Sequence, residues 1–162
     1  MKEEELIQKW RCRVRCLKHA HFDSANQFGR WNGWVGGSLI FFSAAATMVA
    51  TIHIRLHLPD IYYAVLAVLG MVITVLASLQ LYFRFSERAE RHRATAANYA
   101  RLELEIEVMS ISDAAAEGKR STQVRMLQDE WSRLTNGAPI IPKRIYRRHC
   151  GHLENGCSGN AG

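Results

Sequence analysis

A long stretch without charge stands out in the pattern of hydrophobic and polar positions. Residues 61–83, IYYAVLAVLGMVITVLASLQLYF, contain no Asp, Glu, Lys or Arg, and twelve of these 23 residues are Leu, Ile, Val or Phe. As a helix the stretch reaches roughly 35 Å, which is enough to cross the ~30 Å of hydrocarbon in a bilayer. Tyr62, Tyr63 and Tyr82 lie near its ends, where interfacial aromatic residues collect. The pattern predicts a membrane span.

Another uncharged stretch lies before residues 61–83 in the sequence. Residues 34–54, WVGGSLIFFSAAATMVATIHI, are rich in Ala, Gly, Ser and Thr but long enough to span, and Trp31 and Trp34 mark the entrance. Only the six residues 55–60, RLHLPD, separate the two stretches, and so short a segment can only reverse the chain. We therefore expect a helical hairpin.

The distribution of Lys and Arg around the two spans predicts their orientation. Eight of these residues lie near the outer ends of the hairpin, and Arg55 alone lies between the spans. The eight are Arg15, Lys18, Arg30, Arg84, Arg88, Arg91, Arg93 and Arg101. The positive-inside rule then places both termini in the cytoplasm. Thiols stay reduced there, so we expect no disulfide among the four cysteines.

The polar segments on both sides of the hairpin also have helical periodicity. After Arg84, apolar side chains step by three or four residues and form a narrow seam at close to heptad spacing, typical of a coiled coil. The seam consists of Phe85, Ala89, His92, Ala96, Tyr99, Leu102 and Ile106. We expect it to hold a homo-oligomer together.

The N-terminal segment, residues 1–30, is predicted to be an amphipathic, basic helix. It either lies on the membrane surface or packs against the helix that follows the second span, and we favour packing. Residues 84–146 are expected to form a cytoplasmic helical region, which includes a short helix over about 122–135. Pro139 and Pro142 follow this helix and keep the chain extended. Residues 147–162 are expected to be a disordered tail. With residues 31–83 as the hairpin, the fold class is an all-α membrane protein: a two-transmembrane hairpin with long cytoplasmic helical extensions.

Small residues recur at intervals of four in and before both spans. Gly29, Gly33 and Gly37 are expected to allow close helix packing. Two further stripes follow the same interval: Ser43, Thr47 and Thr51 in the first span, and Gly70, Thr74 and Ser78 in the second. These stripes either pack helices against one another or place hydroxyl groups along a water-filled path, and the sequence leaves both interpretations open.

The remaining composition argues against several function classes. The formal net charge is +6, but the basic residues are interleaved with Glu and form no dense block, so we predict no nucleic-acid partner. The chain has no phosphate-binding Gly loop and no HExxH motif, and the spacing of His149, Cys150, His152 and Cys157 fits no zinc pattern. We therefore predict no enzymatic activity, no cofactor and no metal.

The residues after the second span resemble a known family. The pattern F-x-x-x-A-x-x-H-x-x-x-A-x-x-Y-x-x-L over residues 85–102, the two spans with a minimal loop, and GAPIIPKRIY at 137–146 resemble the SLATT domain family. The similarity covers about residues 10–146, although the first span is richer in Gly and Ser than the family pattern.

The resemblance carries an expectation about function. Members of this family accompany SMODS nucleotidyltransferases and SLOG nucleotide-sensing domains in bacterial conflict systems, and are thought to be pore-forming effectors. It implies a homo-oligomeric antiviral defence effector that permeabilises the bacterial inner membrane. A separate nucleotide-signal synthase or nucleotide-sensing protein would be the partner that supplies the trigger. The alternative is a non-conducting membrane anchor or scaffold subunit that recruits a cytoplasmic partner.

Overall fold

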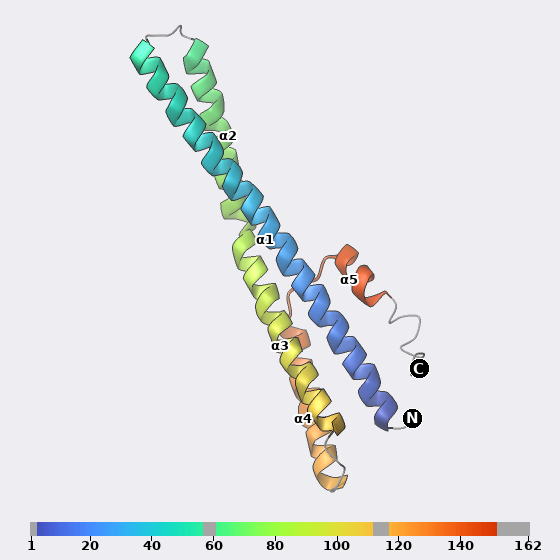
Figure 1. The fold of residues 1–162 in the computed structure, drawn as a ribbon. Helices are drawn as coiled ribbons and strands as arrows, with labels where there is room; N and C mark the ends of the chain where they lie inside the picture. Colours follow the sequence, from blue (N-terminus) through green and yellow to red (C-terminus); the bar gives the residue numbers. More distant parts are fainter. Residues whose placement is uncertain (1–2, 57–60, 112–116, 152–162) are drawn as a thin grey trace. The chain divides into compact units, whose positions relative to one another are not determined.

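The computed structural model describes residues 3–56, 61–111 and 117–151, and the regular elements in these ranges are all helices (Figure 1). In chain order they are α1 (Glu3–Leu56), α2 (Ile61–Phe83), α3 (Phe85–Ile111), α4 (Glu117–Gly137) and α5 (Lys143–Cys150). The all-helical prediction is confirmed for this part of the chain.

The chain forms two compact units, and α1 contributes to both. One unit, here called the bundle, comprises Met1–Asn26 and Ala89–Gly162, and the other, here called the hairpin, comprises Gln27–Arg88. The sequence predicted a separate N-terminal helix over 1–30 and a span over 34–54, but α1 is one helix of 54 residues. Its continuity has a simple cause: the first Pro of the chain is Pro59, and isolated Gly residues weaken a helix without breaking it.

The chain leaves helical geometry for one residue at the end of the second predicted span. Arg84 separates α2 from α3 and has a φ of 47°, in the left-handed region. Its N–H still donates to the Gln80 carbonyl (3.2 Å), and its own carbonyl accepts from the Arg88 N–H (3.1 Å). No Gly or Pro marks this position in the sequence. The change from apolar to charged residues thus coincides with a local change in backbone conformation.

The bundle has a core built by α1, α3 and α4. Its buried members are Ile7, Val14, Tyr99, Leu102, Ile106, Met109 and Leu127, with Trp10, Leu17, Val124, Trp131 and Leu134 packed against them. The expectation that the N-terminal helix packs against the helix after the second span is confirmed.

This core corrects the assignment of the heptad seam to an oligomer interface. Tyr99, Leu102 and Ile106 are each only 1% exposed, and Ala89, His92 and Ala96 are also buried in the same chain. Phe85 belongs to the hairpin and stacks on Phe83. A heptad pattern predicts that a helix buries one face, but it does not specify which chain supplies the covering side chains.

The end of the chain is more ordered than predicted. Residues 147–150 belong to α5, whose Ile145 and Cys150 are buried against Cys16 and Ala20 of α1. The expected disordered tail was therefore wrong for these four residues, and residues 152–162 lie outside the described part. Pro139 and Pro142 precede α5 in a non-helical connection, as predicted, and Pro142 is its N-cap residue.

Candidate functional site

The hairpin exposes its apolar side chains. Two helical stretches each contain an apolar window of 18 residues. Its mean hydropathy is 1.8 in Ile7–Arg55 and 2.3 in Ile61–Ser110, and no part of either window is buried. No residue of α2 is buried, and Leu81 and Tyr82 are each 79% exposed. By length and composition both helices can cross a membrane, where lipid would cover these side chains.

Four hydroxyl groups of the small-residue stripes are bonded within their own helices. Thr47 donates to the Ser43 carbonyl (2.9 Å) and Thr51 to the Thr47 carbonyl (2.8 Å). In α2, Thr74 donates to the Gly70 carbonyl and Ser78 to the Thr74 carbonyl, both at 2.8 Å. These side chains are exposed, so the structure does not bring the two stripes together through their hydroxyls. A donor satisfied by its own backbone needs no water in an apolar medium.

The glycine stripe of α1 is open within this chain. A Cβ added at Gly29, Gly33 or Gly37 would meet no atom within 4 Å, whereas one at Gly36 would lie 3.6 Å from Gln80 Nε2. Among the glycines of α1, Gly36 is therefore the one that lies next to a side chain of α2, and the four-residue interval did not include it. Gly33 and Gly37 instead line a groove of about 540 Å³ with Arg30, Trp34, Ser38, Phe41 and Phe42.

Two buried histidines meet in the bundle. His21 of α1 and His92 of α3 share a hydrogen bond between their Nδ1 atoms (3.0 Å), and the Tyr99 ring stacks on His21 with centroids 5.6 Å apart. Burial, with the nearby His92 charge, lowers the pKa of His21 to about 4, and burial also lowers the pKa of His92. Only one Nδ1 can carry the shared proton, because two N–H groups would face each other otherwise. The pair is a neutral, structural contact at pH 7.

Ion pairs fix the register of α1 against α3. Arg11 Nη2 donates to Glu107 Oε1 (2.7 Å), and Arg15 Nε and Lys18 Nζ donate to the two carboxylate oxygens of Glu103 (2.9 and 2.6 Å). Residue numbers rise along α1 as they fall along α3, so the helices are antiparallel. Burial would raise the pKa of Glu103, but the hydrogen bonds and charges of Lys18 and Arg15 together lower it.

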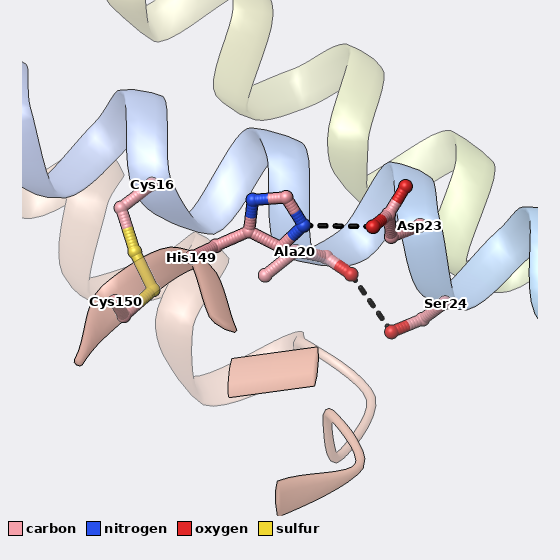
Figure 2. The surroundings of a disulfide bond; sticks show 6 residues. All are labelled: Cys16, Ala20, Asp23, Ser24, His149 and Cys150. Carbon is pink, nitrogen blue, oxygen red and sulfur yellow. Dashed lines mark hydrogen bonds and ion pairs between the residues drawn. A yellow bond between two sulfur atoms is a disulfide. The ribbon is translucent and has the colours of Figure 1, made fainter. Parts of the chain in front are cut away.

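A disulfide and a histidine–aspartate pair attach α5 to α1. Cys16 and Cys150 are joined with their Cα atoms 5.6 Å apart, which corrects the expectation of reduced cysteines; Cys12 is free and exposed. Figure 2 shows His149 pointing from α5 to Asp23 of α1, where its Nε2 donates to Oδ2 (2.7 Å). The sequence missed both contacts, because more than 120 residues separate the partners in each.

The described residues do not contain a group of three or more His, Cys, Asp or Glu side chains placed to hold a metal ion. Of the tail residues considered as metal ligands, His149 and Cys150 have the partners just given, and His152 and Cys157 lie outside the described ranges.

Comparison with known proteins yields no relative. No family model, no curated protein and no solved structure matches the chain. The function therefore has to be argued from the residues and their geometry.

Proposed function

We propose that this chain is an effector that crosses a bacterial inner membrane twice, with both termini in the cytoplasm, and permeabilises it after self-association. The orientation rests on the Lys and Arg bias around the two spans. It makes the Cys16–Cys150 disulfide an exception to the reduced state of most cytoplasmic thiols. The observation that carries the proposal is the exposure of the hairpin. Many of its large apolar side chains are exposed, and α2 buries none of its residues. Contact with lipid or with a second hairpin would remove these apolar side chains from water, which is energetically favourable.

Self-association is assigned to the hairpin and not to the bundle. The seam of α3 is filled by α1 and α4, so the seam residues themselves are not available to a second copy. The open face at Gly33 and Gly37 is different, because a neighbouring helix can approach closely where side chains are absent. We assign this face to contact with the hairpin of another copy.

The trigger is assigned to a partner protein. The resemblance of residues 85–102 to the SLATT domain family supports a nucleotide-signal synthase or a nucleotide-sensing protein in this role. The same resemblance supports a part in antiviral defence. Within the bundle, His21 is bonded to His92, and Glu103 accepts from Arg15 and Lys18. This proposal gives the bundle a signal-receiving role.

A non-conducting anchor or scaffold is the second candidate, and one surface favours it. Leu104 and Val108 of α3 and Met126 of α4 are each more than half exposed. They lie beside Arg101, Glu105 and Glu130, and these residues together line a groove of about 540 Å³. An apolar strip with a charged rim suits a protein partner.

Thr47→Leu separates the two interpretations of the hydroxyl stripes. If Thr47 borders a water path, the added apolar bulk should lower dye leakage from proteoliposomes at least tenfold while the oligomer mass stays constant. If the stripe packs helices, mass and leakage should fall together. Light scattering and leakage are measured on one preparation, and Thr122→Leu on exposed α4 is the matched control.

The outcome for the unmutated chain decides between the two candidate functions. Induced expression with a potential-sensitive dye, followed by leakage from proteoliposomes, should show depolarisation and release. If the oligomer inserts into the liposome membrane but releases no dye, with or without the partner protein, the effector function is contradicted and the anchor function is favoured.

A further inference from the structure

The C-terminal helix α5 presents a strongly basic face to the outside of the bundle. The α5 basic face consists of Lys143, Arg144, Arg147 and Arg148, all of them exposed. The segment 138–151 contains no Asp or Glu. Arg148 of this face forms a long ion pair with Asp23, with 3.9 Å between Nη1 and Oδ2. The same Asp23 oxygen accepts a shorter hydrogen bond from His149 Nε2, at 2.7 Å. The positive charge of α5 is thus mostly uncompensated by the residues of the bundle that the structure describes.

The opposite side of α5 explains why the basic face is held outward. Ile145 is buried against α1, Cys150 is joined to Cys16, and His149 is bonded to Asp23. These contacts lie on one side of an eight-residue helix, as Figure 2 shows for the disulfide and the histidine. Rotation of α5 about its axis would break all of them, so the basic residues have a fixed direction.

The position of the cations within α5 argues against a role in stabilising the helix itself. Lys143 and Arg144 occupy the first turn, where the helix dipole disfavours positive charge, and the N-cap Pro142 makes no side-chain capping bond. Cations at this end lower the stability of an isolated helix. An external anion that binds beside them removes this penalty.

Apolar side chains accompany the basic face. Ile140, two residues before the N-cap, is 94% exposed, and Tyr146 on α5 is 42% exposed. Basic residues with an adjacent aliphatic and aromatic side chain are typical of segments that lie at a lipid–water interface. A nucleic acid would use the charges but gain little from an exposed Ile.

We propose that the α5 basic face, with Ile140 and Tyr146, docks on the anionic phosphate headgroups of a lipid surface. The inference rests on the membrane attachment proposed above and adds a second, peripheral contact to it. The occupant is the anionic leaflet itself, because Lys and Arg side chains are attracted to acidic lipids, whereas neutral lipids offer no such attraction.

The test places an environment-sensitive dye at Ile140→Cys. The background is Cys12→Ser with Cys157→Ser, which leaves one reactive thiol and keeps the Cys16–Cys150 disulfide. In proteoliposomes with about 30% anionic lipid the emission should shift to the blue, and it should not shift in neutral vesicles. Each Lys or Arg near the surface contributes roughly fivefold, so Arg144→Gln with Arg147→Gln should lower the docked-to-free ratio about 25-fold. The matched control, Arg125→Gln with Arg133→Gln on exposed α4 positions, should change nothing.

Several results would overturn the proposal. Equal shifts in neutral and anionic vesicles would show apolar contact alone, and equal effects of the two double variants would show a general charge effect. A larger dye response to single-stranded RNA in detergent than to anionic lipid would assign the face to nucleic acid.

The same samples test the membrane attachment separately. Flotation after an alkaline wash reports on the spans and does not depend on α5. If the chain does not float, the proposal of two membrane spans is wrong. Co-sedimentation of the chain with added anionic vesicles then measures lipid binding by the α5 basic face alone. If the chain floats and the dye does not respond to anionic lipid, only the docking of α5 is wrong.

Discussion

At the scale of single residues, the two buried histidines make the bundle sensitive to mild acid. Above pH 6.5 both are neutral in the folded and the unfolded chain. As the pH falls, the unfolded chain takes up a proton near 6.5, whereas His21 in the folded chain resists protonation until about pH 4. Stability is therefore lost as the pH falls from 6.5 towards 4.

We predict that His21 alone lowers the free energy of unfolding by about 2 kcal/mol between pH 7.5 and pH 5. Thermal unfolding of the detergent-solubilised chain, followed by tryptophan fluorescence, measures the change. His21→Asn keeps a polar group near the Nδ1 position and should flatten the pH dependence, whereas His19→Asn at an exposed site should not. Equal pH dependence in His21→Asn and the unmutated chain would contradict the assignment.

A second residue-scale prediction concerns two glutamates on α3. Glu103 is buried and accepts hydrogen bonds from two cations of α1, whereas Glu105 pairs with Arg101 on the surface of its own helix. Glu103→Gln should cost about 2 kcal/mol, because charged hydrogen bonds in a buried site are strong. Glu105→Gln should cost less than ~0.5 kcal/mol. Chemical denaturation of both variants tests the difference, and equal costs would refute it.

At the scale of elements, α5 depends on its covalent link. An eight-residue helix is too short to be stable alone, and its buried surface is limited to a few side chains. The disulfide closes a loop with a sequence separation of 134 residues, which restricts the unfolded chain strongly. The contact between α5 and α1 should therefore weaken when the disulfide is reduced.

We predict that Cys150→Ser destabilises the bundle by about 2–4 kcal/mol and speeds tryptic cleavage after Arg144 and Arg147 at least tenfold. Dithiothreitol should have the same effect on the unmutated chain and none on Cys150→Ser. Cys12→Ser, which removes the free thiol, serves as control. Unchanged cleavage in the reduced chain would mean that Ile145 and the His149–Asp23 pair hold α5 without the disulfide.

At the scale of the whole molecule, the proposed topology places Arg55 and Asn136 on opposite sides of the membrane. With Cys12→Ser and Cys157→Ser as background, a membrane-impermeant maleimide added outside should label Arg55→Cys at once. It should label Asn136→Cys only after lysis, because the positive-inside bias holds the bundle in the cytoplasm. Labelling of position 136 in intact cells would reverse the orientation, and equal labelling of both positions would argue against two spans.

Local patterns account for most of what the sequence determined. Uncharged stretches, three-to-four-residue periodicity and proline positions depend on neighbours along the chain, so they predicted the helices and two apolar stretches long enough to span. They also predicted that Tyr99 and Leu102 are covered and that Pro139 and Pro142 interrupt the helical region. Arg84 is the exception, because no local signal marks its left-handed backbone.

Tertiary structure decided which segments meet, because such contacts depend on how distant parts of the chain return to one another. The seam of α3 is covered by α1 and α4 of the same chain, which spacing alone cannot distinguish from a neighbouring copy. The partner of His92, the pairing of Cys16 with Cys150 and the packing of α5 on α1 likewise join residues more than 70 positions apart. The amino-acid sequence thus determined which faces need cover, and the folded chain determined what covers them.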